Sequence, residues 1–534
     1  MRPARGPVPA TTVTNDVQLD VDGIDSKGLR LFPHWRTCIG AGRAAEALRA
    51  RFQQHLEMVQ RDMPFSYLRV HGVFHEDMMV YRESAGRAVL NWQYVDMVYD
   101  HWLSVGIRPF VELGFMPYHL ASGDETVFWW RGNITPPRDW DRWEWLVRRF
   151  VEHVIERYGL EEVRRWYFEV WNEPNLAVFW KDADFAAYVA LYERTARAIK
   201  DVDPSLRVGG PATSGAGDVA GRSPWGQPFL AECRRRSIPI DFFSTHPYPT
   251  IHTADLAGQG DMTWDGPDRL AVDLRGVDEL LAATGYSGLE RHFTEWSSSP
   301  SPRDPAHDTA FMAPFIVRNN WVGRGLADGL AFWALSDIFE ENRLGDGPFH
   351  GGFGLVNAQS LKKAAYHGYW FLSRLGPREL ASGERFAATV RDDGTLAILL
   401  WNYQHYRGGS SRSLLEYHRP PDEPDTGEVY GLFEPGSTEY FRLRVSGLDG
   451  TVQLTTTRFD REHGSVYDAW LAMGAPSHLR PGDLEVLRAG MEPEQRSECL
   501  PASEGRLEYS AAVEPHGVTL LEFSGEARPP VPVP

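Results

Sequence analysis

The sequence is poor in cysteine and has no excess of positive charge, and both shortages narrow the class of protein. Its 534 residues include three cysteines, Cys38, Cys233 and Cys499. An odd number at wide spacing gives neither a disulfide framework nor the ligand pattern of a metal site, so we expect reduced thiols. Asp and Glu (73) outnumber Lys and Arg (55), for a formal net charge of −18 at pH 7. Because such a field repels phosphate backbones and anionic lipid, we expect neither nucleic acid nor a membrane as a partner.

An apolar leader is also lacking. The opening stretch MRPARGPVPATTVTND carries two arginines but no apolar segment of a secretory signal, which predicts a cytoplasmic protein. Hydrophobic residues (42%) and charged residues (24%) are close to the globular average, so composition argues against disorder and membrane spanning. Aromatic residues are plentiful, with 19 Trp, 20 Tyr and 27 Phe. Sugar rings stack on such side chains, although most Trp residues simply fill cores.

Short apolar runs alternate with amphipathic stretches between residues 30 and 345, which indicates βα units. We predict strands at 33–39, 66–71, 107–113, 166–171, 206–210, 240–245, 290–295 and 329–334. Helices are predicted at 44–61, 92–105 and 143–158, among others, and the last has one apolar stripe at helical spacing. A doubly wound sheet would give similar local patterns, but eight strands over about 300 residues favour a (β/α)8 TIM barrel.

The pattern changes after about residue 370. Short alternating runs at 386–391, 396–401, 440–445 and 452–458 are separated by Gly, Asp and Pro, which is typical of an all-β region. We therefore predict a catalytic barrel over 26–365 and an accessory β-sandwich domain over 366–534, which the N-terminal segment 1–25 joins. A polar, Pro-rich stretch near 408–425 predicts a long loop.

Catalytic side chains of such barrels stand at the carboxyl ends of the strands. The fourth predicted strand ends in Asn172, Glu173 and Pro174, and the seventh ends in Glu295. These ends face one another across the mouth, so the two glutamates can flank a bond. Glycoside hydrolysis needs such a pair, because one carboxylic acid protonates the leaving oxygen while the other carboxylate attacks the anomeric carbon or activates water.

Other polar residues follow the remaining strands. His246 and Tyr248, two residues apart, point to one face of an extended segment and can bind the nucleophile or the sugar. After the eighth strand, Trp333 is a candidate stacking platform, while Glu340 and Glu341 either accept hydrogen bonds from sugar hydroxyls or form a solvated acidic loop. His71 and His75 have the spacing of a zinc pair, but only a helix brings that spacing to one face, so no metal is predicted.

One rival motif points to a different class of enzyme. Gly40, Gly42 and Ala45 follow a strand and open a helix, which matches the dinucleotide-binding fingerprint. A dehydrogenase would also need an acidic residue at the end of the second strand to hold a ribose hydroxyl, and that strand ends at Val70 and His71. The sequence therefore predicts no cofactor.

Several blocks of the sequence resemble glycoside hydrolase family 39, the bacterial β-xylosidases and their relatives the α-L-iduronidases. The resemblance spans roughly residues 30 to 370, and its blocks fall in family order on the predicted strand ends. They are FPHWRTCIG, YLRVHGVFHEDMMVY, GIRPFVELGFMP, GNITPPRDW, RRWYFEVWNEPNLAVFW, DFFSTHPYP, HFTEWSSSPSPRDPAHDTAF and IFEENRLGDGPFHGGFGL.

The resemblance implies a retaining mechanism with Glu173 as acid/base and Glu295 as nucleophile, their carboxyl groups about 5 to 5.5 Å apart. It implies that Asn172 binds the sugar 2-hydroxyl, that His246 and Tyr248 orient Glu295, and that the peptide bond after Trp333 is cis. The terminal sugar would lie among His71, Trp333, Glu340 and Glu341. The implied activity is an exo-β-xylosidase on short xylo-oligosaccharides, with a homo-oligomer as one expected state.

Two alternatives stay open. In the first, the protein is a glycosidase of the same fold that acts on another sugar, such as an arabinoside, a galactoside or a uronide. The second is a non-catalytic carbohydrate-binding protein, which would be expected to lack one of the two glutamates. The segments 250–266 and 408–425 match no block of the family, and loops set specificity in this architecture.

Overall fold

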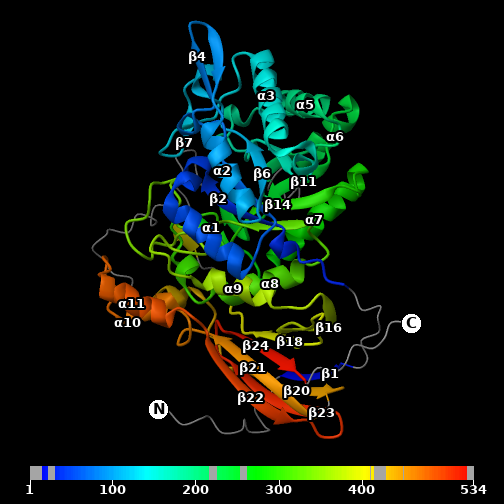
Figure 1. Ribbon diagram of the computed structural model, residues 1–534, viewed down its shortest axis with the longest axis vertical. Helices are drawn as coiled ribbons and strands as arrows, with labels where there is room; N and C mark the ends of the chain where they lie inside the picture. Colours follow the sequence, from blue (N-terminus) through cyan, green and yellow to red (C-terminus); the bar gives the residue numbers. More distant parts are fainter. Residues whose placement is uncertain are drawn as a thin grey trace.

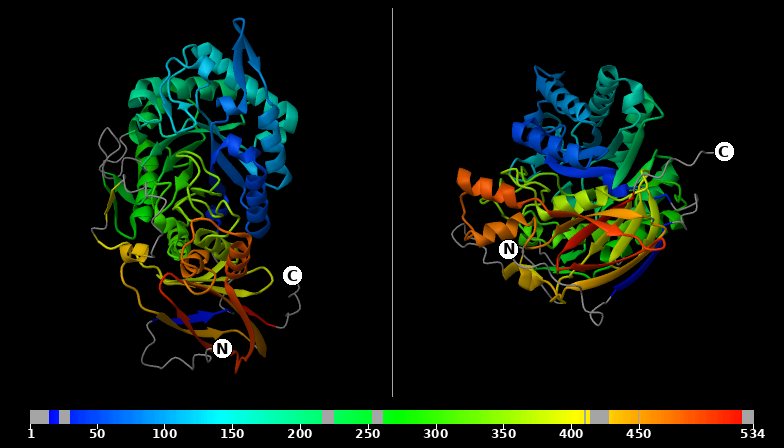
Figure 2. Two further views of the ribbon diagram at one scale, coloured as in Figure 1. Left: turned by 90° about the vertical axis from the view of Figure 1, so that its left-hand side faces the viewer. Right: turned by 60° about the horizontal axis from the view of Figure 1, so that its bottom comes forward.

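The computed structural model describes residues 15–21, 30–215, 225–252, 261–408, 411–413, 428–448 and 450–525. Helices surround a barrel in the upper part of Figure 1, and β-sheets form the lower part. The turned views of Figure 2 show the same division into two regions.

The barrel is closed and consists of eight strands. Neighbouring strands are parallel, and β15 pairs with β2 to complete the ring. This closure confirms the predicted barrel and rules out the doubly wound sheet. The strands are β2 (Cys38–Arg43), β3 (Tyr67–His71), β6 (Arg108–Leu113), β9 (Tyr167–Val170), β10 (Arg207–Ser214), β11 (Phe242–His246), β14 (Glu290–Trp296) and β15 (Gly329–Phe332).

Amphipathic helices cover the outside of the barrel. In α3 (Trp140–Tyr158), apolar side chains that recur three and four residues apart are buried, as the sequence predicts. The Asp139 carboxylate caps this helix by accepting a hydrogen bond from the backbone of Arg142. The other long helices are α1 (Ala50–Asp62), α2 (Gln93–Ser104), α5 (Phe185–Val202), α6 (Gly226–Arg236), α7 (Arg269–Thr284), α8 (Met312–Gly323) and α9 (Ala364–Ser373).

Short elements complete the barrel region. Two hairpins decorate it, β4 (Tyr81–Ser84) with β5 (Arg87–Leu90) and β7 (Thr126–Val127) with β8 (Gly132–Asn133). The short helices are α4 (Leu160–Val163) and the 3-10 helices η2 (His34–Arg36), η3 (Ala44–Leu48), η4 (Glu76–Met78), η5 (Tyr118–Leu120), η6 (Lys181–Ala183), η8 (Pro305–Asp308) and η10 (Glu428–Leu432). None of the described helices is long and apolar enough to cross a membrane.

The first barrel strand differs from its prediction. The expected strand 33–39 is in fact η2 followed by β2, so the strand starts five residues later. Gly40 and Gly42 therefore lie inside the strand rather than in a phosphate-binding turn. A Cβ on Gly40 would lie 2.3 Å from Trp333 Cε3, and one on Gly42 would lie 2.2 Å from Glu46 Oε2. These glycines make room for side chains, which removes the basis of the dinucleotide-binding alternative.

Two sheets form the lower region. The six-stranded sheet has the order β16-β17-β18-β24-β21-β22, and the three-stranded sheet has the order β1-β20-β23. Their buried Val, Leu, Ile, Ala and Phe side chains form one cluster, so the sheets pack face to face. The strands are β1 (Asn15–Asp20), β16 (Arg378–Ser382), β17 (Phe386–Val390), β18 (Leu396–Trp401), β20 (Glu439–Ser446), β21 (Thr451–Phe459), β22 (Glu494–Pro501), β23 (Arg506–Val513) and β24 (Val518–Ser524).

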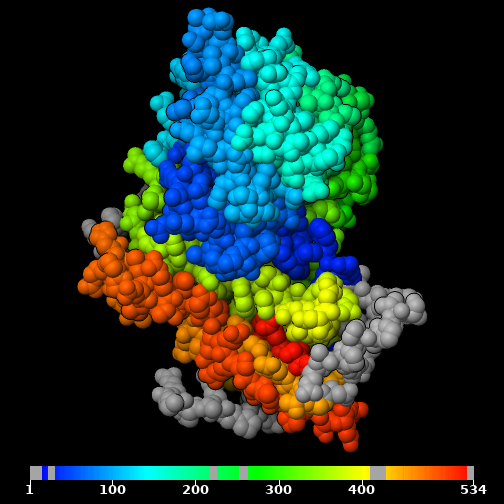
Figure 3. Space-filling view, viewed as in Figure 1, coloured from blue at the N-terminus to red at the C-terminus, as the bar shows by residue number. Residues whose placement is uncertain are grey.

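Two extensions of this β region also contact the barrel region. Between β21 and β22 lie α10 (Val466–Ala472) and α11 (Pro481–Gly490), which the sequence analysis did not predict; they lie beside the barrel in Figure 3. The Trp470 ring lies 5.1 Å from Phe349. A small sheet joins β12 (Thr250–His252), β13 (Asp261–Trp264) and β19 (Ser411–Ser413). The two unassigned segments therefore pair with each other, although 253–260, 409–410 and 414–425 lie outside the described residues.

Candidate active site

Glu173 stands on a tight turn after β9. Trp171 and Glu173 have φ values of 74° and 42°, in the left-handed region that side-chain-bearing residues rarely adopt. The Glu173 backbone N–H donates to the carbonyl of Ala212 at 2.9 Å, and the Trp171 ring N–H donates to the carbonyl of Phe179 at 2.8 Å. These contacts hold a strained turn at the mouth of the barrel, where active sites of this architecture lie.

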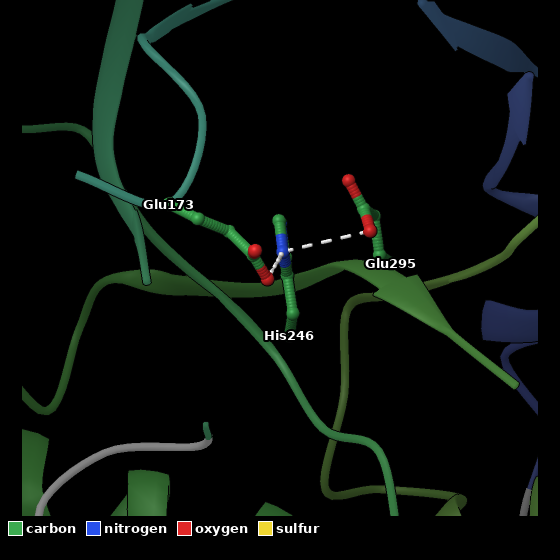
Figure 4. A group of neighbouring side chains, drawn as sticks. All are labelled: Glu173, His246 and Glu295. Atoms are coloured by element: carbon green, nitrogen blue, oxygen red, sulfur yellow. Dashed lines mark hydrogen bonds and ion pairs between the residues drawn. The ribbon is translucent and has the colours of Figure 1, made fainter. Parts of the chain in front are cut away.

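Glu295 approaches Glu173 from β14, where the pairing with β15 shifts register between Phe293 and Trp296. Both glutamates are buried, with exposed fractions of 7% and 6%. One oxygen of each carboxylate lies within 4.8 Å of the other, and His246 lies between the two (Figure 4). The structure thus brings together the two carboxylates that the sequence analysis singled out.

His246, at the end of β11, contacts both carboxylates unequally. Its Nδ1 lies 2.8 Å from Glu173 Oε1 and 3.7 Å from Glu295 Oε2. The Tyr248 hydroxyl donates to Glu295 Oε2 at 2.9 Å. Tyr248 therefore contacts Glu295 as expected, whereas His246 is within hydrogen-bonding distance of Glu173 rather than Glu295.

Arg69 on β3 connects the site to the barrel interior, and the sequence analysis missed it. This fully buried guanidinium donates from Nη1 to Glu295 at 2.8 Å and from Nη2 to the Asn172 side-chain oxygen at 2.9 Å. It also forms ion pairs of 2.6 Å with Glu169 and 2.9 Å with Glu112. Charged residues inside predicted buried strands were the signal that could have revealed this network, because burial requires them to be paired.

His71, at the end of β3, links this network to the loop after β15. Its Nδ1 lies 2.6 Å from Glu112, and its Nε2 lies 3.5 Å from Glu341 and 3.7 Å from Glu295. Burial lowers the pKa of His71, but the charge of Glu112 and hydrogen bonds to Glu112 and Glu341 outweigh it and raise the pKa to about 10. His71 is therefore a cation at neutral pH.

The two remaining candidate residues, Trp333 and Glu340, have different surroundings. Trp333 packs against His71 at 4.9 Å and Phe339 at 5.7 Å, and its peptide bond to Ala334 is cis as expected. Glu340 points elsewhere, since its carboxylate pairs with Arg43 at 2.8 Å and with Arg49. The structure does not bring Glu340 together with the carboxylate pair.

Burial raises the pKa of both glutamates at the mouth, and their hydrogen-bonding partners differ. It raises the pKa of Glu173 to about 7, although a hydrogen bond from the Ser214 side chain and the charges of Arg69 and His71 oppose the rise. Burial also raises the pKa of Glu295, against the charge of Arg69. Glu295 accepts hydrogen bonds from Arg69 and Tyr248, which stabilise its ionised form, while Glu173 contacts neither. These contacts favour the ionised form of Glu295 over the ionised form of Glu173.

The same three residues are the one group among the described residues whose donor atoms lie close enough to hold a metal ion. Both ring nitrogens of His246 already have hydrogen-bonding partners, Glu173 at Nδ1 and Thr294 at Nε2. An ion would have to displace one of these contacts, so the arrangement fits proton transfer better than metal binding.

Comparisons with known proteins agree with this geometry. The model of the glycosyl hydrolases family 39 matches residues 17–508. A beta-xylosidase of Geobacillus stearothermophilus is 36% identical over 514 residues, which cover 95% of this chain and 95% of that protein.

Solved structures give the same result. The GH39 enzyme from Xanthomonas axonopodis pv. citri has a TM-score of 0.85 and 33% identity, covering 98% of this chain and 100% of that one. A monomeric beta-xylosidase from Caulobacter crescentus CB15 has a TM-score of 0.84 and 33% identity, covering 96% of this chain and 99% of that one.

Proposed function

Since the chain belongs to glycoside hydrolase family 39 and is a glycoside hydrolase, we propose that it is a retaining exo-β-xylosidase that releases xylose from short xylo-oligosaccharides. The observation that carries the proposal is the pair of buried carboxylates on β9 and β14, with oxygens within 4.8 Å of each other. Retaining enzymes hold the two carboxyl groups about 5 to 5.5 Å apart, whereas inverting enzymes leave room for a water molecule between them.

In the first step, a Glu295 oxygen bonds to the anomeric carbon while the bond from that carbon to the leaving oxygen breaks. Glu173 gives its proton to the leaving oxygen. Arg69 and Tyr248 direct Glu295, because each donates a hydrogen bond to one of its two oxygens. A covalent glycosyl-enzyme results, with a carboxylate at Glu173.

In the second step, water attacks the anomeric carbon as its bond to Glu295 breaks. Glu173, now a carboxylate, takes the proton from the water and returns to its starting form. The sugar leaves with the anomeric configuration of the substrate, because the carbon is inverted twice.

The sugar itself is proposed to lie among Asn172, His71, Trp333 and Glu341. Asn172 would bind the 2-hydroxyl, and the other three would surround the terminal ring. Glu340 would take part only after releasing Arg43 and Arg49. A uronic acid would need a cation free to meet its carboxylate. Arg69 already contacts four polar side chains, and the His71 cation already pairs with Glu112 and Glu341. This saturation favours a neutral sugar.

The first experiment is hydrolysis of a panel of aryl glycosides by the wild type and by Glu295→Ala. The panel contains the β-xyloside, α-L-arabinofuranoside, α-L-arabinopyranoside, β-galactoside, β-glucoside and α-L-iduronide. We expect the β-xyloside to be cleaved best and Glu295→Ala to lose activity by about 10⁴-fold or more, with azide restoring part of it as a glycosyl azide of inverted configuration.

Glu290→Gln is the matched control, since Glu290 lies at the other end of the same strand. Its rate of glycoside hydrolysis should stay close to that of the wild type. Preference for another glycoside would change the proposed substrate and leave the mechanism intact. Full activity of Glu295→Ala would refute the proposed nucleophile and reopen the carbohydrate-binding alternative.

Size-exclusion chromatography tests the predicted homo-oligomer. The cytoplasmic location also stays a prediction.

A further inference from the structure

The hydrogen bonds behind His246 have a defined direction. We infer that Glu169 and Thr294 fix the tautomer of His246, so that its Nδ1 accepts a hydrogen bond from protonated Glu173. Thr294 is then a positioning residue that keeps the general acid protonated. The inference rests on the proposed role of Glu173 and extends it to residues that never touch the sugar.

Glu169 sets the direction of these hydrogen bonds, because it lies at the end of the series farthest from Glu173. This fully buried carboxylate on β9 is paired with Arg69, whose Nε donates to Glu169 Oε2 at 2.6 Å. An ionised carboxylate only accepts hydrogen bonds. Its other oxygen, Oε1, therefore requires a donor.

That donor is the hydroxyl of Thr294 on β14, at 2.8 Å. A hydroxyl has one hydrogen to donate, so toward any further partner it can only accept. The further partner is His246 Nε2, at 3.1 Å. His246 must therefore carry a hydrogen on Nε2.

Burial lowers the pKa of His246 to about 4, against the charge of Glu295. The ring is thus neutral near pH 7 and has a single N–H, at Nε2, and its Nδ1 presents a lone pair to Glu173 Oε1 at 2.8 Å. Two acceptors at that distance repel each other, so Glu173 must donate. The opposite tautomer would donate to a Glu173 carboxylate and lower its pKa.

The arrangement serves both chemical steps. The lone pair of Nδ1 stabilises the protonated form of Glu173 before the first step. After the proton has gone to the leaving oxygen, the same lone pair faces a carboxylate, which makes Glu173 a stronger base toward water. Thr294 and Glu169 gain and lose no proton in either step.

Other charged and titratable groups face Glu173 and set the background for any pH effect. They are Arg69 and His71 on β3, Glu112 on β6, Glu169 on β9, Tyr248 after β11, Glu295 on β14 and Glu341 after β15. A substitution at Thr294 replaces none of these groups.

The test compares Thr294→Val, which has nearly the same shape but no hydroxyl, with Thr294→Ser, which keeps the hydroxyl. Thr213→Val is the control, because Thr213 is also a buried threonine on a barrel strand but pairs with Thr245. Thr294→Ala is the second variant if the valine protein does not fold. The measurement is kcat/KM against pH for an alkyl and a dinitrophenyl glycoside of the preferred sugar.

We expect Thr294→Val to move the alkaline limb of the alkyl glycoside profile about one pH unit toward acid, because His246 can then donate to Glu173. The dinitrophenyl glycoside needs no proton on its leaving group, so its kcat/KM should change less than about threefold. Thr294→Ser and Thr213→Val should keep the wild-type limb.

An unmoved alkaline limb in folded Thr294→Val or Thr294→Ala would overturn the inference. Glu173→Ala separates this failure from a failure of the proposed function. If Glu173→Ala also leaves the alkyl glycoside profile unchanged, Glu173 is not the acid at all. If Glu173→Ala abolishes that activity while the Thr294 variants behave as wild type, the acid stands and only the role of Thr294 and Glu169 is refuted.

Discussion

The inside of the barrel has two levels of opposite chemistry, although the same strands build both. The lower level, the ring layer, consists of Tyr67, Phe110, Tyr167, Phe242 and His292, whose rings lie 4.5 to 6.4 Å from their neighbours. Two residues further along each strand is the upper level, the polar layer. It consists of Arg69, Glu112, Glu169, Ser244 and Thr294.

The spacing of two explains the division, because alternate residues of a barrel strand point inward. The two levels are stabilised by different means. The ring layer is stabilised by apolar burial and ring contacts, which need no exact partner. The polar layer tolerates buried charge because Arg69 meets several carboxylates at once. Losing a ring should therefore cost stability alone, whereas losing a charge should cost both stability and chemistry.

The largest effect should come from making the polar layer apolar at its centre. Arg69→Met removes the cation that Glu112, Glu169 and Glu295 share. We expect kcat/KM to fall by about 10³-fold and the free energy of unfolding to fall by about 3 to 5 kcal/mol, since buried carboxylates lose their partner.

Arg69→Lys tests whether charge alone suffices. A single ammonium cannot reproduce the fork of the guanidinium, so this variant should regain stability and stay impaired in kcat. Wild-type kinetics in Arg69→Lys would contradict the role given to the guanidinium geometry. Urea unfolding and steady-state kinetics provide both measurements.

The converse substitution lies in the ring layer. Phe110→Ala removes a fully buried ring that packs at 4.8 Å against Tyr167 and at 5.4 Å against Phe242. We expect about 3 to 5 kcal/mol of lost stability from the cavity, with kcat/KM per folded molecule within about threefold of wild type. Urea midpoints and active-site-normalised kinetics would show this. A large fall in kcat/KM of folded protein would mean that the two levels are not independent.

A third prediction concerns Trp333, which lies beside Arg69 and His71 and is proposed to contact the sugar. In Gly40→Ala the new methyl group would meet the Trp333 ring, so the ring must move. We expect KM to rise by about tenfold, because small displacements of a positioning group are costly. Gly288→Ala, where the methyl group meets open space, is the control. An unchanged KM in Gly40→Ala would show that Trp333 does not contact the sugar.

The contrast between the levels also explains what the sequence could predict. Strand number and order were predictable, because apolar runs at regular spacing mark barrel strands whatever their detailed contacts. The start of the first strand was not, since His34 and Trp35 are buried in a 3-10 helix and look like strand residues by composition. The carboxylate pair was predictable because it lies at strand ends, where the fold places chemistry.

Contacts between distant charged residues were beyond prediction. Glu340 seemed equivalent to Glu341 in sequence, yet it pairs with Arg43, 297 residues away. The pairing of β13 with β19 joins two polar segments that carry no alternation of apolar residues. Both outcomes depend on the three-dimensional arrangement of loops, which periodicity does not encode.

The smallest effect should come from a buried carboxylate outside the polar layer. The Glu46 side chain, in η3, lies close to that of Glu340. Its carboxylate is 3.8 Å from the guanidinium of Arg43. Burial and the charge of Glu340 raise its pKa to about 8. The protonated Glu46 side chain contributes fully to the free energy of unfolding below about pH 4.5, the pKa of this carboxyl group in the unfolded chain. That contribution is lost as the pH rises through the folded-state pKa of about 8. In Glu46→Gln the amide oxygen can still accept the hydrogen bond from the Glu340 backbone N–H. Because the amide does not ionise, the variant does not lose this stability at alkaline pH.

Relative to wild type, Glu46→Gln should therefore become progressively more stable as the pH rises from 5 to 8.5, measured from urea unfolding at each pH. Glu57→Gln, on the exposed side of α1, should show no such gain. Glu112 provides the contrast within the polar layer, since the charges of His71 and Arg69 outweigh its burial and lower its pKa. An equal alkaline gain in Glu112→Gln would show that pairing in the polar layer does not protect its carboxylates, and the distinction between the two kinds of buried charge would fail.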